Sequence, residues 1–228
     1  MRRRPVVAID GPAGAGKSTA SRLLARHLGF VLVDTGALYR GVALAAREAG
    51  VSWDDAEALG SLARGLDLRF ESGPDGVPLL LLDGVDRSDD IRTPEISQGA
   101  SDVSRHGPVR DALLGLQRRL GRDGGVVLEG RDIGTVVFPD AEVKIFLTAS
   151  AEVRAGRRVE DLAQRGIEAD PERTLAEIHR RDAQDSGRAV APLRAAEDAV
   201  TLDTTDLDLE GVVGRLAEIV ADRAPGAS

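Results

Sequence analysis

The chain has 228 residues, of which 42% are hydrophobic and 30% charged, a composition typical of a globular protein with one sizeable core. Its formal net charge of −8 argues against nucleic acid or an anionic membrane surface as a partner. It has no cysteine, so disulfides and thiolate metal sites are excluded, and its longest apolar run, residues 77–82, is far too short to span a bilayer. We expect a cytoplasmic monomer that acts on small molecules.

Mostly apolar segments alternate with segments of helical periodicity along the chain. The sequence predicts strands at 5–9, 31–33, 126–129, 143–147 and 199–203. It predicts helices at about 17–28, 36–49, 108–121, 150–165, 171–184 and 209–222. Apolar strands separated by helices indicate an α/β fold, with a parallel five-stranded sheet covered by helices on both faces.

The segment after the first strand fits the phosphate-loop pattern G-x-x-x-x-G-K-[ST] in full. Its residues are Gly11, Pro12, Ala13, Gly14, Ala15, Gly16, Lys17, Ser18 and Thr19. Glycines allow backbone N–H groups to approach phosphate oxygens, and the following helix N-terminus adds partial positive charge. We expect Lys17 to bridge the β- and γ-phosphates of ATP and Ser18 to ligate Mg²⁺. Of the 30 Lys and Arg residues only Lys17 and Lys144 are lysines, so a lysine stands where the loop needs a compact charge.

Two segments depart from the simple alternation. Residues 66–71 and 77–83 flank Gly, Pro and Asp and predict a β-hairpin, with helices at about 53–64 and 93–105 on either side. This hairpin indicates an insertion between the second and third strands of the sheet. The segment 154–188 is rich in Arg and Asp and poor in large apolar residues, which favours a mobile flap.

We expect these segments to form a single domain of three parts. The core covers about 1–35, 107–153 and 189–228, the insertion about 36–106, and the flap about 154–188.

Polar residues follow the predicted ends of two strands. Asp34 and Thr35 follow one of them, and Glu129, Arg131 and Asp132 follow another. Carboxyl ends of parallel strands lie at one edge of a sheet, so these residues should share a crevice with the loop. We give Arg131 a functional role because Arg binds phosphate oxygens bidentately.

The loop alone leaves several functions open. A GTPase would need a base-reading N-K-x-D motif, and neither lysine is preceded by Asn. A kinase of a small acceptor remains, as does a nucleotide-binding module without turnover. Further Arg and hydroxyl residues favour a phosphorylated acceptor, because transfer onto a phosphate gathers several negative charges in one cleft.

Four motifs together resemble the bacterial cytidylate kinases. They are I-D-G-P-A-G-A-G-K-S-T, D-T-G-A-L-Y-R, E-G-R-D-I-G-T-V-V-F-P-D-A and R-R-D-A-Q-D-S-G-R-A-V-A-P-L, spread over about residues 5–222. The family resembles adenylate kinase in having a core, an acceptor-binding insertion and a lid. The resemblance therefore implies a single P-loop kinase domain, in which the insertion at about 36–106 binds the acceptor and the flap at about 154–188 is the lid. The resemblance implies transfer of the γ-phosphoryl of ATP to CMP or dCMP, with Mg²⁺. Other small-molecule P-loop kinases, of the UMP/CMP, AMP or shikimate type, remain alternatives, and a non-catalytic nucleotide sensor is a further one.

The resemblance also implies roles for individual residues. Those expected at the acceptor are Thr35, Arg40 and Arg131 on the α-phosphate, Ser101, Arg110 and Asp132 on the cytosine edge, Arg181, Asp185 and Arg188 on the sugar and phosphate, and Tyr39 in the same site. The lid arginines Arg154, Arg157 and Arg158 are expected to reach the transferring phosphoryl group; with Lys17 and Arg131, we take Arg154 and Arg158 as the catalytic set. The family often has Ser where this chain has Thr35, and the hydroxyl is retained. Glu129 is a weaker candidate for orienting water around Mg²⁺.

Overall fold

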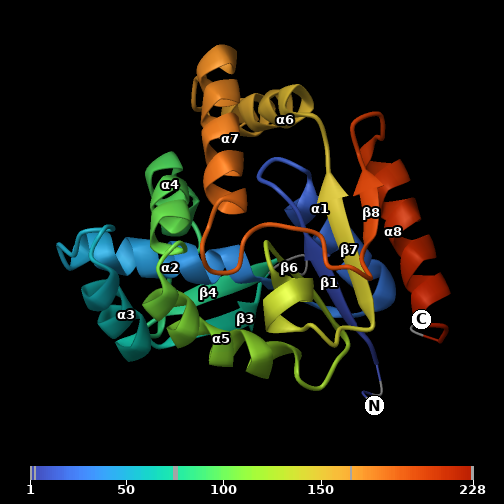
Figure 1. Ribbon diagram of the computed structural model, residues 1–228, viewed down its shortest axis with the longest axis horizontal. Helices are drawn as coiled ribbons and strands as arrows, with labels where there is room; N and C mark the ends of the chain where they lie inside the picture. Colours follow the sequence, from blue (N-terminus) through green and yellow to red (C-terminus); the bar gives the residue numbers. More distant parts are fainter. Residues whose placement is uncertain (1, 3, 74–76, 165, 227–228) are drawn as a thin grey trace.

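The computed structural model describes residues 2, 4–73, 77–164 and 166–226 and has a central five-stranded sheet (Figure 1). All four strand pairs are parallel, in the order β2-β6-β1-β7-β8. The strands are β1 (Val6–Asp10), β2 (Val31–Asp34), β6 (Val126–Gly130), β7 (Val143–Thr148) and β8 (Val200–Asp203). The predicted α/β fold is therefore confirmed, with every strand boundary within one residue of its expected place.

Helices cover both faces of this sheet, which explains why its strands are mostly apolar. Helices α1 (Lys17–Leu28) and α8 (Leu209–Arg223) pack on the face that receives Val7 and Ile9. The alternate residues of β1, Val6 and Ala8, pack on the other face, against α5 (Gly107–Gly121) and a π-helical turn, η3 (Ile133–Val137). Successive side chains of a strand point to opposite faces, so one short strand serves two cores.

The predicted insertion forms a third core beside the sheet. It contains α2 (Thr35–Glu48), α3 (Ala56–Gly65), β3 (Leu68–Ser72), β4 (Pro78–Leu82), β5 (Val85–Asp86), a 3₁₀ turn η2 (Asp90–Arg92) and α4 (Pro94–Val103). Strands β3 and β4 pair antiparallel, with Leu68 opposite Leu82, which confirms the hairpin. Of its predicted turn, residues 74–76 lie outside the described part of the chain. Leu38, Leu59 and Ile96 are fully buried in this core.

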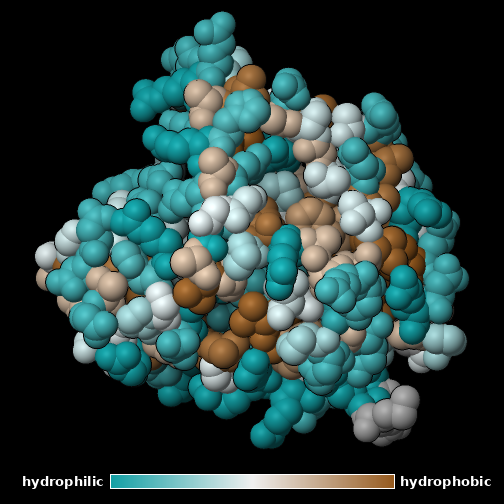
Figure 2. Space-filling view, in the orientation of Figure 1, coloured by the Kyte–Doolittle hydropathy of each residue, from teal (hydrophilic) through white to brown (hydrophobic). Residues whose placement is uncertain are grey.

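Helices α6 (Ala151–Gln164) and α7 (Pro171–Ser186) project beyond the edge of the sheet (Figure 1). Their projecting end is mostly hydrophilic (Figure 2). α7 begins where the Asp170 carboxylate accepts the N–H of Arg173, with Pro171 in its first turn. The residues of α6 and α7 therefore correspond closely to the segment predicted as the lid, about 154–188. The mobility of this segment remains a prediction. No helix in the described ranges is long and apolar enough to cross a membrane.

Candidate active site

The glycines of the predicted phosphate loop take backbone conformations that other residues avoid. Gly14 and Gly16 have φ of 77° and 82°. A Cβ on Gly11 would lie 2.0 Å from the carbonyl oxygen of Leu147, so the loop runs directly against the end of β7. The α1 helix begins at Lys17, immediately after the last glycine, which places a helix N-terminus at the loop.

Lys17 is buried, and its ammonium donates to the carbonyl of Pro12 at 2.6 Å, within its own loop. Burial holds the pKa of Lys17 well below its usual value, and the nearby Arg131 guanidinium lowers it further. Glu129 acts in the opposite direction and favours the charged form. Bound phosphates would provide the negative charge that this buried cation needs.

Ser18 and Glu129 bring oxygen ligands together beside Lys17. The Ser18 hydroxyl donates to one carboxylate oxygen of Glu129 at 2.9 Å. The other oxygen, Oε1, is buried and has no hydrogen-bond partner in the described structure. Burial raises the pKa of Glu129 to about 7, and the Asp34 carboxylate contributes to the rise. A hard, oxygen-preferring cation such as Mg²⁺ fits this pair, because it would use both oxygens and stabilise the charged carboxylate.

The ends of neighbouring strands orient the residues expected on the acceptor phosphate. The Thr35 hydroxyl donates to the backbone carbonyl of Glu129 at 2.7 Å, so it joins β2 to β6. Asp34 caps α2 by accepting the N–H of Ala37, and it also accepts from Arg40 at 2.6 Å. The side chain of Arg40 is thereby held at the start of α2, facing the crevice that the strand ends form.

A buried ion pair occupies the region expected to bind the base. Arg110 of α5 is paired with Asp132, and both side chains are less than a tenth exposed. The Arg110 guanidinium lies over the ring of Tyr39, with its Cζ 5.6 Å from the ring centroid, a cation–π contact. Two of the three residues expected to read cytosine, Arg110 and Asp132, are therefore paired with each other, and the third, Ser101, is buried and has no side-chain hydrogen bond in the described structure.

A second ion-pair group stands beside it. Asp185 of α7 accepts from Arg131 at 3.0 Å and is also paired with Arg188. Although burial raises the pKa of Asp185, the surrounding guanidinium groups outweigh burial and hold that pKa below its usual value. Burial lowers the pKa of Arg181 to about 10, and Arg131 adds to this effect. The positive charges around Asp185 form a site suited to an anion.

Asp10, at the end of β1, anchors the segment that carries these residues. Its two carboxylate oxygens accept the N–H groups of Ile133 and Gly134, both at 2.8 Å. Burial raises the pKa of Asp10 to about 6, and these two hydrogen bonds partly offset the rise. Asp10 therefore joins the strand before the phosphate loop to the turn after Asp132.

One cleft of about 1030 Å³ contains the loop and most of the predicted acceptor residues. The predicted residues that line it are Ala13, Gly14, Ala15, Gly16, Lys17, Ser18, Thr19, Asp34, Thr35, Tyr39, Arg40, Arg110, Glu129, Arg131, Asp132, Arg157, Arg158, Arg181, Asp185 and Arg188. Four residues that line it have a buried side-chain atom without a hydrogen-bond partner in the described chain: Arg40 Nε, Glu129 Oε1, Arg181 Nε and Arg188 Nε. The predicted Ser101 does not line the cleft, but its Oγ is also unpaired, next to the lining residue Ala100. Because folded proteins rarely leave such atoms unpaired, this concentration points to a polar ligand.

Arg154 and Arg158, which sequence analysis places on the same phosphoryl group, have very different surroundings. Arg158 lines the cleft and pairs with Asp161 at 3.2 Å. Arg154 is buried against the phosphate loop, where it donates to the carbonyls of Ala13 and Ala149. Its guanidinium also forms a bidentate ion pair with Asp182. These partners engage all three nitrogens of the Arg154 guanidinium, so in this conformation Arg154 supports the loop.

Another arm of the cleft was missed by the sequence interpretation. It is lined by Leu207, Asp208, Leu209 and Val212, which were not predicted, and by Arg157, which was expected with the lid arginines at the transferring phosphoryl group. Arg157 donates to the hydroxyl and the carbonyl of Thr204, just after β8. The predicted end of β8 was the available signal, since the carboxyl ends of all five parallel strands lie at the same edge.

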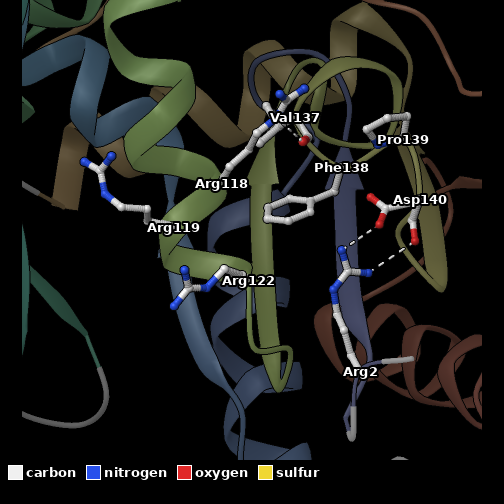
Figure 3. Close-up of a pocket in the computed structure, with 8 residues that line it drawn as sticks. All are labelled: Arg2, Arg118, Arg119, Arg122, Val137, Phe138, Pro139 and Asp140. Carbon is white, nitrogen blue, oxygen red and sulfur yellow. Dashed lines mark hydrogen bonds and ion pairs between the residues drawn. The ribbon is translucent and has the colours of Figure 1, made fainter.

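A smaller cavity of about 340 Å³ lies near the opposite ends of the strands (Figure 3). Its Arg2 is paired with Asp140 and Glu142, and its Arg118 donates to the backbone carbonyls of residues 136 and 137. Arg119 and Arg122 point away from Phe138 (Figure 3). Its arginines therefore do not converge on a common point, and we assign this cavity no ligand.

The five-stranded parallel sheet, the glycine loop at its carboxyl edge and the arginine-rich cleft define a P-loop kinase. The comparisons with known proteins narrow this class. The family model "Cytidylate kinase" matches residues 7–222. The chain belongs to the cytidylate kinase family.

Several relatives are similar over nearly the whole chain. A "Cytidylate kinase" from Syntrophotalea carbinolica is 53% identical over 98% of this chain and 94% of its own length. One from Geobacter sulfurreducens is 51% identical, with 99% and 98% covered. A "Bifunctional pantoate ligase/cytidylate kinase" from a Synechococcus species is 48% identical over 98% of this chain and 46% of its own length.

Among solved structures, an uncharacterized protein from Eubacterium ventriosum has a TM-score of 0.52 at 11% identity, covering 96% of this chain and 100% of that one. At this identity the likeness supports the fold alone.

Proposed function

We propose that this chain transfers the γ-phosphoryl group of ATP to CMP or dCMP, giving ADP and CDP or dCDP. The observation that carries the proposal is one cleft in which a phosphate loop faces a second, arginine-rich anion site. A nucleotide sensor has no need of a second anion site. The family to which the chain belongs supports a cytidine acceptor over the AMP and shikimate alternatives.

The loop residues 11–19 would bind the donor phosphates through backbone N–H groups, with Lys17 on the β- and γ-phosphates. The ammonium of Lys17 would exchange the Pro12 carbonyl for phosphate oxygens. Ser18 and Glu129 would hold Mg²⁺ directly or through water, and the ion would neutralise charge on the donor phosphates. The donor base would lie in the arm formed by Arg157, residues 207–209 and Val212.

The acceptor would lie across the ends of β2 and β6. Thr35, Arg40 and Arg131 would hold its phosphate, because they surround one crevice with donors that fit phosphate oxygens. Ser101, Arg110 and Asp132 would read the cytosine edge, with the Asp132 carboxylate accepting from the exocyclic amine. Arg181, Asp185 and Arg188 of the α7 region would contact the sugar and phosphate.

The reaction needs little covalent chemistry from the protein, since the acceptor phosphate oxygen is already a competent nucleophile. Lys17 and Arg131 would align it with the γ-phosphoryl group and stabilise the charge that develops. Arg158, at the cleft wall, would add to this stabilisation when α6 and α7 close. Closure would also exclude water and so suppress ATP hydrolysis.

All of these residues come from one chain, which supports a monomer as the active unit. Nucleotide substrates and the absence of cysteine support a place in the cytoplasm. Size-exclusion chromatography with light scattering would test the first statement, and fractionation of the native host the second.

An ADP-forming assay over a panel of acceptors tests the proposed function. CMP and dCMP should stimulate ADP formation strongly, and UMP, AMP and shikimate weakly. Strong stimulation by AMP or shikimate would show that the protein is a different small-molecule kinase. Tight ATP binding without acceptor-dependent ADP formation would identify a sensor instead.

A further inference from the structure

The buried pair of Arg154 and Asp182 connects two parts of the cleft that bind different substrates. Arg154 lies at the start of α6 and contacts the phosphate loop. Asp182 lies on α7, which also carries Asp185 on the acceptor side. The proposed function uses the loop and Asp185 but gives Asp182 no role.

On the donor side, the contact between α6 and the loop is unusually close. The Arg154 Nη1 group donates to the carbonyl of Ala13 at 3.1 Å. A Cβ on Gly14 would lie 2.9 Å from the Cβ of Arg154 and 3.0 Å from its carbonyl oxygen. Only glycine fits there, so a shift of the loop backbone has to move the first turn of α6 as well.

On the acceptor side, α7 is tied to Arg154 by two hydrogen bonds. Asp182 accepts from Nη1 at 3.0 Å and from Nη2 at 2.6 Å, a planar two-bond geometry that fixes direction as well as distance. The Arg154 side chain is 6% exposed and the Asp182 side chain 28%, so solvent reaches the pair from the Asp182 side and screens it in part. One helical turn along α7, Asp185 accepts from Arg131 in the acceptor site.

A third contact ties α7 to the insertion. Gln184 of α7 donates to the carbonyl of Ser101 in α4 at 3.1 Å. The helix α7 therefore touches the loop through Arg154, the end of β6 through Arg131, and α4 through Ser101. The structure shows α7 seated, with all three contacts made; a rigid helix held in this way would lift as a unit once the Arg154 pair is broken.

We propose that Asp182 is a positioning residue that couples the two substrate sites, so that ATP and CMP each strengthen the binding of the other. Donor phosphates fix the loop and with it the Ala13 carbonyl. Arg154 then stays aligned, and α7 stays seated with Asp185 and its arginines in place for the acceptor. Coupling of this kind is reciprocal and typically changes affinity by about 5- to 150-fold.

The test measures CMP binding by calorimetry with and without a non-hydrolysable ATP analogue and Mg²⁺. In the native protein the analogue should tighten CMP binding by about 5-fold or more. In Asp182→Asn the ratio of the CMP affinity with the analogue to that without it should fall to near one, while each nucleotide alone binds as in the native protein. Glu177→Gln, which removes an exposed carboxylate from the same helix, should keep the native ratio.

A second variant provides an independent check. Arg154→Lys keeps the positive charge but loses the planar fork, so it should lose coupling as Asp182→Asn does. The double variant should lose no more than either single one, because both act through one link. This result would also separate positioning from direct action of Arg154 on the phosphoryl group, since direct action predicts an additional loss of kcat in Arg154→Lys alone.

The inference rests on the proposed function, and the two fail in different ways. Absence of CMP binding and turnover in the native protein would overturn the proposed function. Normal turnover with equal CMP affinity in the presence and absence of the analogue would overturn the coupling alone. A native coupling ratio retained in Asp182→Asn, even with weaker binding of both nucleotides, would reduce Asp182 to a purely structural role.

Discussion

Lys17 is the single residue on which the proposed phosphoryl transfer depends most. Lys17→Ala should reduce turnover by about 100- to 1,000-fold, because it removes a main electrostatic stabiliser of the transferring group. The fold should be retained, since the ammonium contacts its own loop and not an apolar core. The measurement is kcat with circular dichroism as the folding control, and a folded variant with native turnover would remove Lys17 from the mechanism.

Asp132 is expected to select cytosine over uracil. Facing uracil, its carboxylate would meet a carbonyl oxygen, and this mismatch of two acceptors costs about 1–3 kcal/mol, roughly tenfold to more than a hundredfold in kcat/KM. Asp132→Ala should therefore lose CMP activity much more than UMP activity. The CMP/UMP ratio of kcat/KM is the readout, and a ratio that the substitution leaves unchanged would show that Asp132 does not read the base. Asp132→Asn serves as the isosteric comparison, because Ala also leaves Arg110 without its partner.

Glu129 should make the substrate-free fold less stable as the pH rises. Its pKa is raised to about 7 in the folded state, from an ordinary value of 4.5, mainly by burial. The folded chain therefore holds more protons than the unfolded chain between these values, and the free energy of unfolding falls as the pH rises through that window.

Removing the Glu129 charge should reverse this effect. Glu129→Gln should raise the free energy of unfolding at pH 8 by roughly 1–3 kcal/mol, with the gain shrinking toward pH 5, while kinase activity falls. Denaturant unfolding across this pH range measures the gain. Glu71→Gln, on the exposed side of β3, is the control and should change stability little at any pH. A gain for Glu129→Gln that is constant with pH would contradict the role of its ionisation.

At the level of single residues, the sequence predicted which side chains meet but not how they are partnered. Asp34, Thr35, Glu129, Arg131 and Asp132 could be placed in one crevice because each follows a strand of a parallel sheet. The partners of Arg154 could not be inferred, since the loop and α7 are far apart in sequence. In a chain so rich in arginine, composition gives no sign of which guanidinium groups are buried.

At the level of elements, the segment 154–188 carries the clearest dynamic prediction. It has few buried apolar side chains, and its ordering contacts are mainly polar. Its amide hydrogen exchange should slow when an ATP analogue and CMP are both present, and less with either alone. Hydrogen-exchange mass spectrometry measures this, and equal exchange in all four states would show that the segment is not a lid.

Element boundaries were predicted well wherever the hydrophobic period was long. The helices α1, α5 and α8 each begin and end within one residue of expectation. The π-helical turn at residues 133–137 was not predicted, because five residues are too few to show a period. Its formation depends on Asp10, more than a hundred residues earlier, which accepts the N–H groups of Ile133 and Gly134. The two-residue strand β5 was missed for the same reason of length.

At the level of the whole molecule, strand order brings the chemistry together. In the order β2-β6-β1-β7-β8, the loop after β1 lies between the acceptor residues after β2 and β6 and the arm after β8. The sequence predicted the parallel sheet but not its strand order. The end of β8 could therefore be placed at the same edge as the loop, but its side of the loop, where Arg157 lines the cleft, could not.

The central claim is that one cleft moves a phosphoryl group from ATP to a cytidine monophosphate. Phosphorus NMR of the native protein with ATP, Mg²⁺ and CMP tests it most directly, because donor and acceptor signals are followed in one sample. We predict that CDP and ADP appear in equal amounts at every time point, and that Lys17→Ala slows both signals together. ADP that accumulates with inorganic phosphate and without CDP would contradict the claim, since it would mean transfer to water and not to the nucleotide.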